Sequence, residues 1–92
     1  MESGAKRSVR RSIDTDQYIR MTARIVAGAG RRVADADPEE LRQLLALRDA
    51  VDQAVLAAVT GLRHSGATWQ DIGDAIGTTR QAALMRWAKK VH

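Results

Sequence analysis

The chain has 92 residues, of which 28% are charged and only 3% are Phe, Trp or Tyr, and its formal net charge is +4. A chain of this length forms one small domain that buries only about 60 to 65% of its unfolded surface, so a second copy is a natural source of extra stability. The absence of cysteine excludes disulfide and thiolate chemistry, and the absence of any apolar run of signal-peptide or membrane-spanning length predicts a cytoplasmic protein.

The positive charge lies at the two ends of the chain. Residues 1–13 carry a net charge of +3 and residues 78–92 carry +4, whereas residues 14–77 carry −3. Basic ends beside a near-neutral body are typical of a protein that binds a polyanion, although a solvated basic tail explains any single cluster as well. Because residues 1–13 lack apolar periodicity, we expect a flexible basic arm there. Its cations could enter a DNA minor groove or stay idle: Lys6, Arg7, Arg10 and Arg11.

The composition is rich in Ala, Arg and Leu and poor in β-branched runs, which predicts an all-α fold of about four helices. A first helix is expected from Asp14, as N-cap, to about Ala34. Its apolar stripe consists of Tyr18, Met21, Ile25, Ala29 and Val33. Gly28 and Gly30 weaken this helix and mark either close packing or an early end.

A second, longer helix is expected over residues 38–64. Asp37 can cap it, and Pro38 fits its first turn. The sequence "HSG" at 64–66 ends it near a glycine. Its main apolar stripe consists of Leu44, Leu47, Val51, Ala54, Ala58 and Leu62.

Residues 68–91 predict two short helices joined by a sharp turn. Thr68 and Asp71 fit a capping box at the start of the first one. Gly77 suits the left-handed conformation that ends a helix. The side chains expected to point inward from this helix are Trp69, Ile72 and Ile76.

The last helix is capped by Thr78 or Thr79, and Thr78 with Gln81 would form a second capping box. Ala83 and Trp87 are expected to face the core, while small residues at Gly73 and Ala83 would let the two helices approach closely.

The stretch "WQDIGDAIGTTRQAALMRW", Trp69 to Trp87, resembles the helix-turn-helix of bacterial DNA-binding proteins. It is most similar to that of small actinobacterial regulators and of the DNA-binding region of sigma factors. The stretch departs from the usual pattern at Thr78, where an aliphatic residue is common, and at Ile76, where Leu is usual. The resemblance implies base-facing positions at Thr79, Arg80, Gln81, Leu84 and Met85, and backbone-contacting positions at Thr68 and Gln70.

The side-chain chemistry independently suits duplex DNA. Arg80 can bond guanine O6 and N7 together, and Gln81 can bond adenine N6 and N7. Leu84 or Met85 could contact a thymine methyl group or, alternatively, another protein. Lys89 and Lys90 supply charge for the phosphate backbone.

The sequence therefore predicts a sequence-specific, double-stranded DNA-binding transcriptional regulator that acts as a homodimer and is not an enzyme. No cofactor or metal is expected, since His64 and His92 have no ligand cluster around them. One alternative is a sequence-tolerant, nucleoid-associated architectural protein. Another is an adaptor that contacts RNA polymerase through the helix pair.

Overall fold

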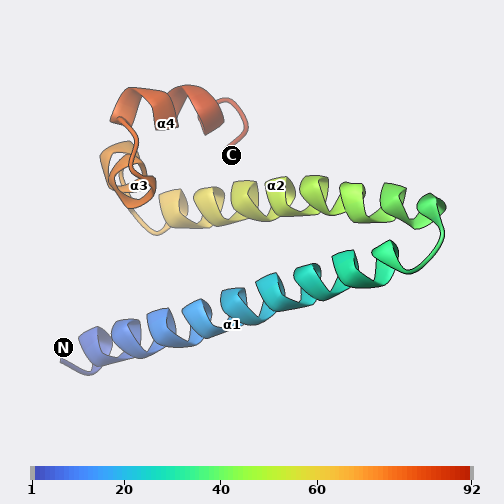
Figure 1. Ribbon diagram of the computed structural model, residues 1–92. Coiled ribbons are helices and arrows are strands. Elements are labelled where there is room, and N and C mark those ends of the chain that lie inside the picture. Colours follow the sequence, from blue (N-terminus) through green and yellow to red (C-terminus); the bar gives the residue numbers. More distant parts are fainter. Residues whose placement is uncertain (1, 92) are drawn as a thin grey trace. The chain divides into compact units, whose positions relative to one another are not determined.

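The computed structural model describes the backbone of residues 2–91 and the side chains of residues 14–91. Within this part of the chain the fold is all-α, as predicted, with four α-helices, a short 3-10 helix and no strand (Figure 1). The chain divides into two units, Met1–Leu44 and Leu45–His92, which are described separately.

The first unit consists mainly of α1, which spans Glu2–Ala34. The predicted end at Ala34 is confirmed, and neither internal glycine ends the helix early. The expected helix start at Asp14, after an irregular arm, is wrong, because the backbone is already helical from Glu2. Residues 2–13 contain no proline and several good helix formers, so nothing in their sequence stops the helix before Glu2. The side chains of the four arm cations lie outside the described residues, and their contact with DNA stays a prediction.

A tight turn leads from α1 into the long second helix. Pro38–Glu40 form the 3-10 helix η1, and α2 follows over Leu41–His64. The expected helix 38–64 is therefore right at its end but begins with a 3-10 turn, which is common at helix starts. Asp37 occupies the cap position in extended conformation. Its carbonyl accepts from the Glu40 N–H at 3.1 Å, but its side chain makes no capping bond.

The apolar stripes of the two long helices are largely exposed. Of the α2 side chains only Val59 is buried, while Leu44 and Leu56 are half-buried. The exposed large apolar side chains of α1 are Tyr18, Ile19, Met21, Ile25 and Val26, and those of α2 are Leu41, Leu45, Leu47, Val51, Val55 and Leu62.

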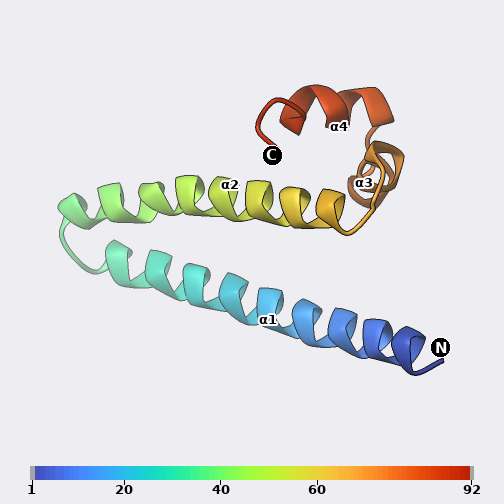
Figure 2. The ribbon, with the colours of Figure 1, turned by 180° about the vertical axis from the view of Figure 1, so that it is seen from behind.

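The second unit contains the core. Val59 packs with Ile72, Ala83 and Trp87, so one residue of α2 meets the inner faces of both short helices, α3 (Trp69–Ile76) and α4 (Arg80–Trp87). Further apolar contacts come from Leu56, Ala67, Trp69 and Val91. Seen from both sides, α3 lies at the C-terminal end of α2, and α4 runs back alongside the last turns of α2 (Figure 2).

The link from α2 to α3 is a tight glycine turn. Gly66 has φ +103°, its N–H donates to the Arg63 carbonyl at 3.0 Å, and the Ala67 N–H donates to the Leu62 carbonyl at 3.0 Å. This pair of bonds is the Schellman motif, which satisfies the last carbonyls of a helix. The Arg63 guanidinium also donates to the Ala67 carbonyl at 2.9 Å and lies over the Trp69 ring, 4.9 Å from its centroid. The predicted stop at residues 64–66 is thus confirmed.

Candidate nucleic-acid interface

The start of α3 is fixed by the predicted capping box. The Asp71 N–H donates to Thr68 Oγ1 at 3.0 Å, and the Thr68 N–H donates to Asp71 Oδ2 at 2.9 Å. The bond from the Thr68 backbone and a second one from its side chain hold the pKa of the Asp71 carboxyl below its ordinary value. Two otherwise unpaired N–H groups of the first turn are thereby satisfied within the helix itself.

The turn after α3 brings the two short helices into backbone contact. Gly77 takes φ +75°, as predicted, and the Thr78 N–H donates to the Gly73 carbonyl at 2.8 Å. A Cβ atom on Gly73 would lie 2.9 Å from the Thr79 carbonyl oxygen and 3.0 Å from that of Thr78. Only glycine fits there without displacing the backbone, which confirms the predicted close approach.

The cap of α4 is Thr79, which resolves the alternative left open by the sequence. The Ala82 N–H donates to Thr79 Oγ1 at 3.0 Å, while Thr78 lies half-buried in the turn. The hydroxyl of Thr79 keeps its own proton for donation to an external acceptor. This side chain therefore caps the helix and remains exposed at its leading end.

The inner residues of the helix pair match the prediction except at one position. Ile72, Ala83 and Trp87 are buried, and Trp69 is half-buried against them. Ile76, expected to point inward, is 54% exposed. It lies in the last turn of an eight-residue helix, where Gly77 redirects the chain away from the core.

The predicted base contacts lie on different sides of α4. At about 100° per residue, Gln81 and Met85 point roughly 160° away from Ala83, so both lie on the outward side. Met85 is 74% exposed. Arg80 is also exposed, but it lies about 20° from the buried Trp87 around the axis, so it projects from the first turn on the inner side of the helix. Leu84, on the adjoining flank, is half-buried and less available than predicted.

The predicted phosphate contacts are all exposed, but their settings differ. Lys89 and Lys90 follow α4 in a turn, in which the Lys90 N–H donates to the Trp87 carbonyl at 2.9 Å, so the last helix ends earlier than the expected residue 91. Gln70 on α3 donates from Nε2 to Asp74 Oδ1 at 2.8 Å, which leaves its second amide proton for a phosphate. Thr68, at the start of α3, is engaged in the capping box.

Two features of this surface were missed by the sequence reasoning. Asp71 and Asp74 give α3 negative charge, so the cations of the helix pair belong to α4 and the turn that follows it. Arg86 lies over the Trp87 ring, with Cζ 4.7 Å from the centroid, in a cation–π contact. The hydrogen bond between Gln70 and Asp74 could also have been predicted from the sequence, because residues i and i+4 are neighbours on a helix.

No known protein family, curated protein or solved structure matches this chain. Among the described residues, no group of three or more His, Cys, Asp or Glu side chains could hold a metal ion. In the same part of the chain, no helix has both the length and the apolar character to cross a membrane.

Proposed function

We propose that α3 and α4 form a helix-turn-helix that binds double-stranded DNA, with α4 entering the major groove. The observation that carries this proposal is the close backbone approach of Gly73 to the turn before α4, which leaves no room for a side chain between the two helices. A recognition helix needs such a support, because side chains read bases only when their helix is held at a set depth and angle in the groove.

The exposed chemistry of α4 supports the same proposal. The outward face offers the Gln81 amide and the Met85 side chain, and Arg80 and Thr79 stand at the leading end. These groups match base edges, since an amide pairs with adenine, a guanidinium with guanine and an apolar group with the thymine methyl. From Arg80 to Lys90 the chain carries four cations and no acid, as expected for a helix that runs between phosphates.

The proposed biological role is a transcriptional regulator located in the cytoplasm on the nucleoid. The decisive experiment is selection of bound sequences from a random duplex pool, followed by titration of selected and scrambled duplexes at physiological salt. A regulator binds its selected site about 10³-fold or more tightly than scrambled DNA. Near-equal affinity for both duplexes would favour the sequence-tolerant architectural protein instead.

Individual bases are assigned by single substitutions. Arg80→Ala and Gln81→Ala should each cost roughly 1 to 3 kcal/mol on the selected site and relax preference at one base pair, with a smaller loss on scrambled DNA. The matched control is Arg42→Ala in the first turn of α2, outside the helix pair. Equal losses on every duplex would identify Arg80 as a phosphate contact.

A protein-binding adaptor is a second candidate, favoured by the exposed apolar side chains Ile76 and Met85 on the helix pair. Such an adaptor would contact RNA polymerase. Failure to bind any duplex, together with retention of purified RNA polymerase that Met85→Ala abolishes, would support it over the DNA-binding proposal.

We also propose a homodimer. The apolar side chains exposed along α1 and α2 are more numerous than the four buried in the core among the described residues, and a second copy is the partner that such stripes suit. A dimer would select inverted half-sites about 10 bp apart, or a multiple of that distance. Sedimentation of a monomer at micromolar concentration, with selection of a single half-site, would refute the dimer and leave DNA binding in place.

A further inference from the structure

An open cavity of about 320 Å³ lies within the second unit, between α2 and α4. Most of its lining side chains are exposed to solvent, and only Trp87 is buried. Its apolar lining consists of Val55 and Leu56 from α2 and the indole of Trp87 from α4, and Gln53 of α2 adds an amide. This volume is at the lower end of the range of about 300 to 1,000 Å³ typical of ligand sites. The cavity therefore suits a metabolite of few atoms.

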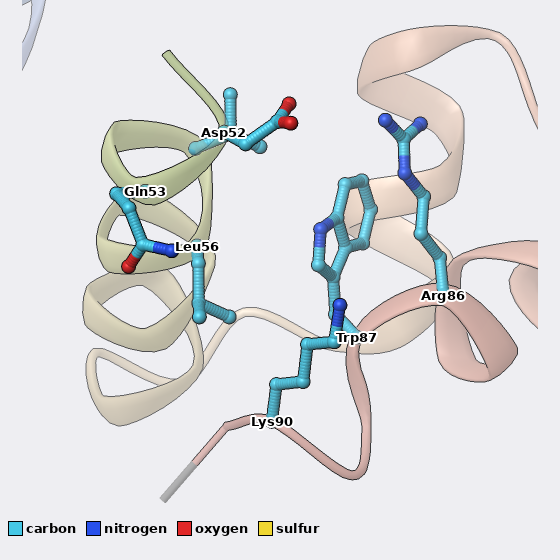
Figure 3. A pocket seen from close by; sticks show the side chains of 7 residues that line it. Asp52, Gln53, Leu56, Arg86, Trp87 and Lys90 are labelled. Carbon is cyan, nitrogen blue, oxygen red and sulfur yellow. The ribbon is translucent and has the colours of Figure 1, made fainter. Parts of the chain in front are cut away.

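The charges around this cavity are divided by sign. Asp52 on α2 contributes a carboxylate, whereas Arg86 and Lys90 contribute cations from α4 and the turn after it. In Figure 3 the Asp52 carboxylate points from α2 toward the Trp87 indole, and the Arg86 guanidinium stands beside the indole. The cation–π contact at 4.7 Å favours this position of the exposed Arg86 side chain.

This pattern selects among chemical classes. A simple anion would pair with the cations but would be repelled by the Asp52 carboxylate. A simple amine would pair with Asp52 but would be repelled by Arg86 and Lys90. An internal peptide segment has no charged ammonium or carboxylate end and would pair with neither sign. A zwitterion with an apolar side chain pairs with both signs and covers the apolar lining, so it is the class that meets a favourable charge at each end.

We propose that this cavity binds a free α-amino acid with an apolar side chain. Its ammonium group bonds to Asp52, its carboxylate bonds to Lys90 with Arg86 adding positive charge nearby, and its side chain lies on Leu56 and Trp87. The proposal does not depend on DNA binding, although the site shares Lys90 with the proposed phosphate contacts.

Trp87 reports directly on occupancy of the cavity. The chain has two tryptophans, so Trp69→Phe leaves Trp87 as the single indole. Titration of this full-length variant with L-leucine should change its fluorescence saturably, with a dissociation constant of about 1 mM or below. 4-Methylpentanoate lacks the ammonium group and 3-methylbutylamine lacks the carboxylate, and each should bind at least about tenfold more weakly.

Two substitutions in the same background separate the ends of the ligand. Asp52→Asn should weaken leucine binding about tenfold or more while leaving 4-methylpentanoate binding nearly unaffected. Lys90→Gln should likewise weaken leucine binding but leave binding of 3-methylbutylamine nearly unaffected. Asp49→Asn, one turn earlier on α2 and outside the cavity lining, is the matched control for charge.

No saturable change up to about 20 mM leucine, or equal effects of Asp52→Asn and Asp49→Asn, would overturn the proposal. A fluorescence change that depends on protein concentration, and not on leucine, would assign the cavity to a second copy of the chain and would also overturn it.

Discussion

Replacing Gly73 by alanine tests the backbone contact that holds α4 against α3. The new Cβ would lie 2.9 Å from the Thr79 carbonyl oxygen and 3.0 Å from both the Thr79 carbonyl carbon and the Thr78 carbonyl oxygen. These are backbone atoms and cannot rotate away. The Thr79 carbonyl also accepts from the Ala83 N–H at 3.1 Å, so moving it disturbs the first turn of α4.

The two opposing effects have comparable magnitude, and the structure decides which is larger. Alanine in a helix gains about 1 kcal/mol over glycine. Overpacking costs about 1 to 3 kcal/mol, and weakening the 2.8 Å bond from the Thr78 N–H to the Gly73 carbonyl costs about 0.5 to 1.5 kcal/mol more. We expect a net loss of about 0.5 to 3.5 kcal/mol, which lowers Tm by roughly 2 to 28 °C in a chain of this size.

Gly61→Ala in α2 is the matched control, because nothing lies within 4 Å of the Cβ position there. This variant should gain up to about 1 kcal/mol. Urea and thermal unfolding followed by circular dichroism measure both variants. If Gly73→Ala is as stable as Gly61→Ala, the helices are not in backbone contact and α4 has no rigid support.

Four further outcomes are expected. Thr79→Ala should destabilise the chain by about 0.5 to 2 kcal/mol in urea unfolding through loss of the α4 cap, whereas Thr22→Ala, whose hydroxyl bonds only within α1, should change stability less. Folding lowers the pKa of the Asp71 carboxyl, so the carboxylate stabilises the fold fully above its ordinary pKa of 3.8, and this stabilisation is lost as the pH falls through the lower pKa of the folded state. The difference in unfolding free energy between wild type and Asp71→Ala should therefore shrink when unfolding is measured at pH values below 3.8. Trp87→Ala removes a buried indole and should cost about 3 to 5 kcal/mol, enough to unfold much of the second unit at 25 °C by circular dichroism. Replacing Lys89 and Lys90 by alanine should weaken binding to all duplexes alike and lower the salt slope of DNA affinity by about one for each lysine that neutralises a phosphate, and an unchanged slope would show that neither lysine binds a phosphate.

Local chemistry made the C-terminal helix pair predictable. The Thr68–Asp71 box and the Gly77 turn each depend on residues within a few positions of one another. The spacing of Ala83 and Trp87 marks one face of α4, although Val59 and Ile72, which cover that face, come from other helices. The close approach of Gly73 to the turn was also predicted, because a residue as small as glycine lets two helices come close together.

The predictions that were wrong concern the end of a helix or the turn after it. Residues 2–13 continue α1 because no breaker separates them from it, although their lack of an apolar stripe favoured an irregular arm. Ile76 has the periodicity of a core residue but lies at the last turn of α3, beyond the reach of the core. The placing of Gln81 on the outward side of α4 and of Arg80 near the inner side required the burial of Trp87 to define the inner face.

The contact at Gly73 is between backbone atoms of α3 and backbone atoms of the turn before α4, so the angle between α3 and α4 does not depend on the exposed side chains of α4. Exchange of Gln81, Ala82 and Met85, all exposed, would therefore leave the support intact. A library randomised at these three positions should yield mostly folded proteins, and new binding preferences could be sought in it without redesign of the scaffold. Drift at the same positions would let descendants of this chain acquire new binding sites while keeping one architecture.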